Sequence, residues 1–152
     1  MRPIPLLLCG LVAAALALPA QAADSRYQSG QQLNARQMSA LGNLPVYAVD
    51  QRQYRLLPQK TSDGASLLVN AQGAVFSSHN EILITGASEN AVQLGAQQGP
   101  PPASVQHFAA TGITVVRYAD FPAAASGLAH LRRQLPAAVV RLGLEQGQMT
   151  PY

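Results

Sequence analysis

Short apolar runs separated by turn-forming residues dominate the chain up to residue 80. PVYAV (45–49) and QYRLL (53–57) predict two short strands around a turn, and a linker with turn chemistry follows from Pro58 to Ser62. SLLVN and AVFSS flank the turn AQG, in which Gly73 adopts positive φ at little cost. These two runs therefore predict a hairpin.

Strand-like and helix-like patterns alternate after residue 80. EILIT (81–85) is a strongly β-prone run, and Ser88 and Glu89 then provide a cap and a first-turn carboxylate for a helix over residues 88–98. SVQHFA and ITVVRY, joined by a Thr-Gly turn, predict two further strands. The predicted order is strand 81–85, helix 88–98, strands 104–109 and 113–118, helix 121–135 and strand 138–144.

The helix over residues 121–135 has the clearest pattern. Asp120 is a suitable cap, and Pro122 falls in the first turn, where its missing N–H costs little. One face carries the apolar side chains, whereas His130, Arg133 and Gln134 are expected to point elsewhere. The predicted buried stripe is Ala124, Leu128, Leu131 and Leu135.

The β-α-β-β-α-β order predicts an α+β fold. It corresponds to a ferredoxin-like antiparallel sheet with both helices on one face, preceded by a β-rich N-terminal extension. Residues 24–40 are polar and predict a flexible arm with a short helix around residues 33–40. The expected organisation is a signal peptide (1–23), the extension (24–78), the α+β domain (79–144) and an extended tail (145–152).

The first residues are typical of a secretory signal peptide. Arg2 precedes an apolar run from Leu6 to Leu18, and Ala20-Gln21-Ala22 forms a small-x-small cleavage site. This run is shorter than the about 20 apolar residues that span a bilayer, which argues against a permanent anchor. Cys9 lies inside the run and lacks the small residues expected before a lipidated cysteine. We therefore expect export to the periplasm. Secretion from the cell together with a partner is a second possible destination.

Charge and cysteine content exclude several classes of function. Removing residues 1–23 takes away one basic side chain and leaves nine basic and seven acidic ones on 129 residues, a net charge of +2. These charges are scattered, and only Arg132 and Arg133 are adjacent, so nucleic acid and anionic membranes are poor candidates as partners. Cys9 is the single cysteine, and it leaves with the signal peptide. Disulfides, thiol nucleophiles and cysteine metal sites are thus excluded.

The candidate catalytic residues form no recognisable motif. His79, His107 and His130 are too far apart for a local metal motif, and His130 is expected on the solvent side of its helix. No serine lies in a Gly-x-Ser-x-Gly elbow or precedes a lysine by three residues. The carboxylates Glu81, Glu89 and Asp120 begin predicted elements, where a capping role is expected. We expect no catalytic residue, cofactor or metal, and hence no enzyme.

The C-terminal half resembles the propeptide and inhibitor family of subtilisin-like serine proteases. The resemblance is carried, in order, by EILITGASENAVQLGAQQ, SVQHF, GITVVRYAD, LAHLRRQLPAAVVRL and the ending MTPY. These are patterns over about half of the chain, not invariant catalytic residues. No protease sequence follows Tyr152, so the chain is more similar to the stand-alone external chaperones of kexin-like proteases, and the extension 24–78 suits that comparison.

The resemblance implies how such a protein would act. A propeptide of this family assists folding of its protease and inhibits it in a 1:1 complex, with its sheet packed on the enzyme and its tail in the substrate groove. By this resemblance Tyr152 would occupy the first specificity pocket and Met149 the fourth. Thr150 would face partly outward, and Pro151 would stiffen the extended segment. The alternative for the tail is a frayed chain end.

Two alternatives remain open at this point. A kexin-like partner would prefer a basic residue where Tyr152 lies, so the tail would sit shifted or the partner would have subtilisin-like specificity. A second class of function is a periplasmic accessory or assembly domain that binds some other protein. A subtilase gene beside this one, lacking its own prodomain, would favour the first class.

Overall fold

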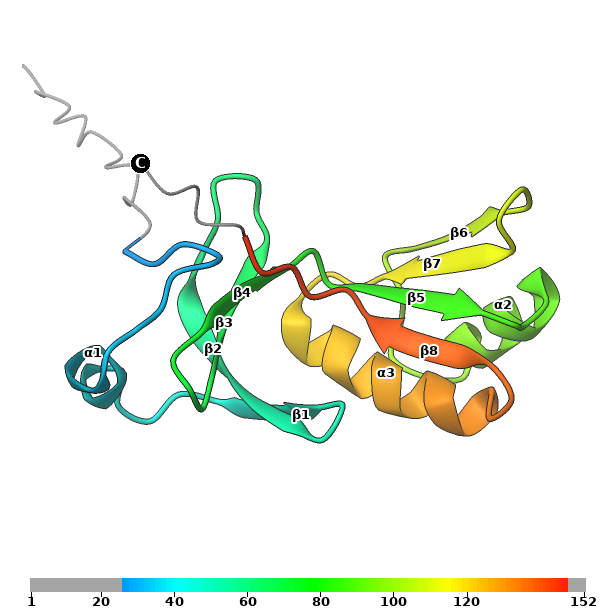
Figure 1. Cartoon of the computed structure of the whole chain (residues 1–152). Coiled ribbons are helices and arrows are strands. Elements are labelled where there is room, and N and C mark those ends of the chain that lie inside the picture. Colours follow the sequence, from blue (N-terminus) through cyan, green and yellow to red (C-terminus); the bar gives the residue numbers. More distant parts are fainter. Residues whose placement is uncertain (1–25, 148–152) are drawn as a thin grey trace, which may run out of the picture.

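The computed structural model describes residues 26–147, which form an α+β fold with two antiparallel four-stranded sheets and three helices (Figure 1). The predicted signal peptide, Cys9 and the tail residues 149–152 lie outside the described residues. The elements are α1 (Ala35–Ala40), β1 (Val46–Val49), β2 (Arg52–Lys60), β3 (Ser66–Asn70), β4 (Val75–Ser78), β5 (Glu81–Thr85), α2 (Glu89–Gln97), β6 (Ser104–Phe108), β7 (Ile113–Arg117), α3 (Phe121–Gln134) and β8 (Val139–Leu142).

The first sheet has the strand order β1-β2-β3-β4. Asp50 and Gln51 both have positive φ, as a two-residue hairpin turn of type I′ requires, and Val49 pairs directly with Arg52. The predicted β3–β4 hairpin is confirmed, with Gly73 at φ +86°. The predicted linker from Pro58 is wrong, because β2 continues to Lys60. The strand tolerates Pro58 at a register shift, where a missing N–H removes no ladder bond.

The second sheet has the order β6-β7-β5-β8, with every neighbouring pair antiparallel. Helix α2 connects β5 to β6, and α3 connects β7 to β8; the two helices contact each other and the sheet. Alternate strand residues face these helices and are buried, which is the period of two expected for a sheet covered on one side. The inward residues include Ile82, Ile84, Val116, Val140 and Leu142.

The predicted helix caps and apolar stripe are confirmed. The Ser88 hydroxyl accepts from the Ala91 N–H at 3.3 Å, and the Asp120 carboxylate accepts from the Ala123 N–H at 2.8 Å. Along α3, the predicted stripe faces the sheet. Ala124, Leu128 and Leu131 are buried and Leu135 is half-buried.

One hydrophobic core joins the two sheets. Val49, Tyr54 and Leu68 of the first sheet belong to the same buried cluster as the inward residues of the second sheet and α3. A smaller cluster lies on the other side of the first sheet, where Tyr27 and Leu33 pack. The N-terminal arm is thus more firmly packed than its polar composition predicts. Its short helix, α1, is confirmed and begins at an Asn34 capping box.

No helix within residues 26–147 has the length and hydrophobicity needed to cross a membrane.

Candidate partner-binding surface

Among residues 26–147, both helices that contact the second sheet lie on one side of it, and its other face has no helix over it (Figure 1). Because side chains alternate along each strand, the residues between the buried ones share this open face. The pairings place Leu83 between Val115 of β7 and Arg141 of β8 in the middle of the sheet. The open face is formed by Glu81, Leu83, Thr85, Ser104, Gln106, Phe108, Ile113, Val115, Arg117, Val139 and Arg141.

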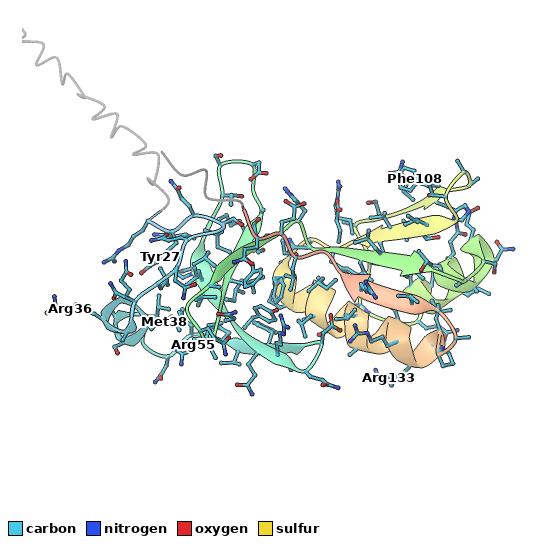
Figure 2. The ribbon with its side chains drawn as sticks, viewed as in Figure 1. Tyr27, Arg36, Met38, Arg55, Phe108 and Arg133 are labelled. Carbon is cyan, nitrogen blue, oxygen red and sulfur yellow. The ribbon has the colours of Figure 1, made fainter. Side chains whose placement is uncertain are left out.

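The open face is apolar at its centre and at one end. Leu83, Phe108 and Val139 are 38%, 42% and 51% exposed. Within residues 26–147, three of the five exposed large hydrophobic side chains therefore belong to this one face, and such gathering is more informative than a single exposed residue. Figure 2 shows Phe108 at the β6 side of the sheet, away from α3. A shallow hollow on this face is lined by Leu83, Thr85, Val139 and Arg141.

Charged side chains border the apolar centre. Arg117 donates from Nε to Glu81 Oε1 at 2.9 Å across the β5–β7 pair. This ion pair lies at one end of the open face. Arg141 lies beside Leu83 on the edge strand β8 and is exposed. The charged side chains thus lie at one end and along one edge of the face, and apolar area with a polar margin is typical of protein-binding surfaces.

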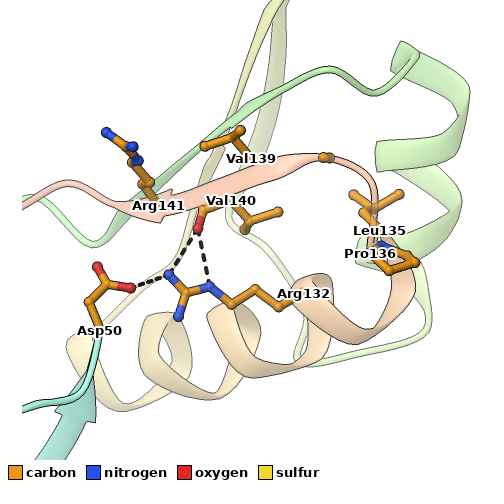
Figure 3. Close-up of a pocket in the computed structure, with 8 residues that line it drawn as sticks. Asp50, Arg132, Leu135, Pro136, Val139, Val140 and Arg141 are labelled. Carbon is orange, nitrogen blue, oxygen red and sulfur yellow. Dashed lines mark hydrogen bonds and ion pairs between the residues drawn. The ribbon is translucent and has the colours of Figure 1, made fainter.

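The edge of β8 is partly occupied by Arg132 of α3 (Figure 3). Its guanidinium donates twice to the Val140 carbonyl, at 3.0 and 3.1 Å, and also pairs with Asp50 in the β1–β2 turn. These contacts lie at a hollow of about 590 Å³ beside the end of α3. Arg132 therefore links the first sheet to the edge of the second and occupies one backbone carbonyl that an added strand would need.

The chain that follows β8 runs beside β4 (Figure 1). Glu145 and Ser77 exchange backbone hydrogen bonds at 2.8 and 2.9 Å, and the Gly147 N–H donates to the Ser29 hydroxyl at 3.0 Å. The first part of the predicted tail is thus held by backbone groups, which no side-chain pattern indicates. The predicted protease-contacting residues Met149, Thr150, Pro151 and Tyr152 begin two residues beyond Gly147.

Comparison of the chain with protein-family models, with curated proteins and with solved structures yields no match.

The three histidines make separate local contacts. His79, in the predicted loop, has Nε2 3.4 Å from the Asp63 carboxylate, and His107 in β6 has Nδ1 2.9 Å from the Thr114 hydroxyl. His130 is not on the solvent side of α3 as predicted, because its Nε2 lies 3.0 Å from the Gly95 carbonyl of α2. Within residues 26–147, no three side chains of His, Cys, Asp or Glu are grouped as a metal site would require.

The candidate carboxylates have structural partners. Asp120 caps α3 as predicted, and Glu89 accepts from the Gln93 amide in the first turn of α2. Glu81 does not cap an element but pairs with Arg117. A hydrogen bond from the Thr61 hydroxyl lowers the pKa of Asp63, and burial raises the pKa of Tyr118.

Proposed function

We propose that this chain is an exported chaperone and inhibitor of a subtilisin-like serine protease, with no catalytic activity of its own. It would act in the periplasm, or outside the cell with its partner, as a separate chain in a 1:1 complex. The partner would be kexin-like or subtilisin-like in specificity. Residues 149–152 would lie in its substrate groove.

We also propose a ferredoxin-like fold for the second sheet and its two helices. The order β5-α2-β6-β7-α3-β8, the sheet order β6-β7-β5-β8 and the packing of α2 on α3 support a ferredoxin-like domain of the propeptide type. The first sheet and the arm would then be an addition to that domain.

The observation that carries the proposal is the open face of the second sheet. It exposes Leu83, Phe108 and Val139, with the Glu81–Arg117 ion pair at the opposite end, and the chain leaves the same sheet through its edge strand β8. A partner covering this face would bury apolar area without disturbing the core, because the buried residues face α2 and α3. The residues after β8 would extend the contact by strand addition, in which backbone groups bind and alternate side chains fill pockets.

Folding assistance follows from the same contact. A large protease with many non-local contacts folds slowly and is prone to kinetic traps, and a preformed surface that binds its native-like state favours productive folding. The proposed chaperone would thus stabilise elements of the protease that its sheet covers. Inhibition would be the consequence of retaining that contact after folding.

The proposal is tested with the mature chain, residues 24–152, and a purified bacterial subtilisin as the probe. We expect stoichiometric inhibition, and deletion of residues 149–152 should remove most of it while thermal melting stays unchanged. Undiminished inhibition after the deletion would show that the sheet face alone binds and that the tail is a frayed end. Absence of inhibition of both subtilisin and a kexin-like protease would favour the accessory or assembly domain instead.

The proposed chaperone activity is tested separately from the inhibition. A subtilase encoded without a prodomain should become active on co-expression with this chain and stay inactive without it. Equal protease activity with and without the chain would contradict the chaperone function and leave inhibition standing.

A further inference from the structure

The edge of β4 is covered by two segments from opposite ends of the described chain. On one stretch, the Val75 N–H donates to the Gln31 carbonyl and the Gly30 N–H donates to the Val75 carbonyl, both at 2.9 Å. On the next stretch, Ser77 exchanges hydrogen bonds with Glu145. The N-terminal arm and the base of the C-terminal tail therefore meet on the same strand.

Ser29 joins these two segments directly. Its hydroxyl donates to the Glu145 carbonyl at 2.9 Å and accepts from the Gly147 N–H at 3.0 Å. The Ser77 hydroxyl supplies a second bond to it at 3.1 Å. One donor and two acceptor sites are all that a serine hydroxyl has, so its hydrogen-bonding capacity is fully used.

Two glycines allow the segments to touch. A Cβ atom at Gly147 would lie 2.7 Å from the Ser29 carbonyl oxygen, and one at Gly30 would lie 2.8 Å from the Gly147 carbonyl carbon. Both neighbours are backbone atoms, which cannot rotate out of the way. The arm itself is anchored, because Tyr27 and Leu33 are buried beside Val75.

We infer that the N-terminal arm is a positioning device that fixes where and in which direction the inhibitory tail leaves the domain, with Ser29 as its key residue. This inference rests on the proposed function and assigns a role to the extension that precedes the propeptide-like domain. Strand β4 alone holds the chain as far as Glu145, through the hydrogen bonds of Ser77. The arm adds another bond to the Glu145 carbonyl and, through Ser29, extends the held segment to Gly147.

The physical gain is preorganisation. Each residue that is ordered only on binding costs conformational entropy, and fixing Gln146 and Gly147 beforehand removes their share of that cost from the binding step. A shorter tether also raises the effective concentration of the tail at the groove once the sheet has docked. The arm thus strengthens inhibition without touching the protease.

The contact itself is tested by amide hydrogen exchange in the mature chain alone. Ser29→Ala should speed exchange of the Gly147 amide at least tenfold, whereas Ser29→Thr, which keeps the hydroxyl, should largely preserve its protection. Ser62→Ala is the matched control, since Ser62 is exposed and away from this contact. Unchanged exchange in Ser29→Ala would overturn the inference.

The consequence is tested by inhibition of the subtilisin probe in a double-mutant cycle with deletion of residues 148–152. One lost hydrogen bond corresponds to about a 5- to 10-fold change in affinity, so Ser29→Ala should weaken inhibition by that factor only when the tail is present. Gly147→Ala, a second variant that separates the segments by a clash, should act in the same way. Thermal melts at matched concentration identify any variant that is simply unfolded.

The results of these inhibition assays distinguish a failure of the inference about the arm from a failure of the proposed function. Inhibition by the wild-type chain that Ser29→Ala and Gly147→Ala do not change would overturn the inference and leave the proposed function intact. An equal loss with and without residues 148–152 would also overturn it, because the arm would then act through the domain and not through the tail. No inhibition by the wild-type chain would overturn the proposed function and the inference with it.

Discussion

The ring of Tyr118 lies on the backbone of Gly127, so that a Cβ atom at Gly127 would be 2.7 Å from Cε2 of Tyr118. Alanine is favoured over glycine in a helix by about 1 kcal/mol. In α3 this gain should be outweighed, because the added methyl group must displace a buried ring, and overpacking costs about 1–3 kcal/mol. We expect Gly127→Ala to lower the midpoint of thermal unfolding.

Gly95 of α2 provides the matched control for Gly127. It is also a buried helical glycine, but its Cβ would meet only the side chains of Gln134 and Leu131 at 3.5 and 3.6 Å, which is ordinary contact. Gly95→Ala should therefore be neutral or stabilising by up to about 1 kcal/mol. Equal effects of the two substitutions in denaturant unfolding would contradict the packing described for Tyr118.

Leu131 and Leu94 form a second matched pair. Leu131 is fully buried between α3 and the sheet, whereas Leu94 on α2 is 60% exposed. Leu131→Ala should lower the free energy of unfolding by about 2–5 kcal/mol, because a cavity is added to the lost burial. Leu94→Ala should change it by less than about 0.5 kcal/mol. Urea unfolding followed by circular dichroism measures both, and a small loss for Leu131→Ala would refute the predicted core face of α3.

Most strands of the second sheet and both of its helices can be predicted from the sequence alone. Asp120, Pro122 and the leucines of α3 each indicate the same helix, and the alternation in β5 and β7 separates an inward from an outward set of residues. Such local agreement between capping, spacing and strand pattern makes a segment predictable. The exposed Leu83 could be recognised from this alternation as a residue on the open face once α2 and α3 are assigned to the other side.

Other features depend on contacts that leave no pattern in the sequence. His130 occupies a polar position on the helical wheel, yet it packs over Gly99 and reaches the Gly95 carbonyl, since glycines leave room for it. The contact of Ser29 with Gly147 spans 118 positions and uses one hydroxyl and backbone groups. Neither residue belongs to a periodic run, so the packing of the arm against the tail could not be predicted from periodicity.

Tyr118 should make the protein sensitive to alkaline pH. Burial raises the pKa of its phenol above the ordinary value of about 10, so the folded state holds the proton at pH values where the unfolded chain releases it. Its contribution to stability is complete below about pH 10 and is lost as the pH rises further. Tyr118→Phe keeps the ring and removes this proton equilibrium. Its free energy of unfolding should fall less than that of the wild type between pH 9 and 11, and parallel pH profiles would contradict this explanation.

The open sheet face should tolerate a charge in the free chain but not in a complex. Leu83 lies at its centre, 38% exposed, between Val115 and Arg141. Leu83→Glu should fold normally, because the new carboxylate points to solvent beside Arg141. In the complex it would be buried in an apolar contact without water, a change expected to cost about 2 kcal/mol or more, which is roughly 30-fold in affinity.

Leu94→Glu is the control for Leu83→Glu, since it places the same charge at an exposed leucine of α2, outside the open face. Inhibition constants against the subtilisin probe should rise for Leu83→Glu and stay unchanged for Leu94→Glu. The comparison is made in the full chain and in the chain lacking residues 149–152, because sheet and tail would contribute separately. If Leu83→Glu inhibits as well as the wild type in both backgrounds, the sheet face takes no part in binding, and any remaining inhibition must come from the tail alone.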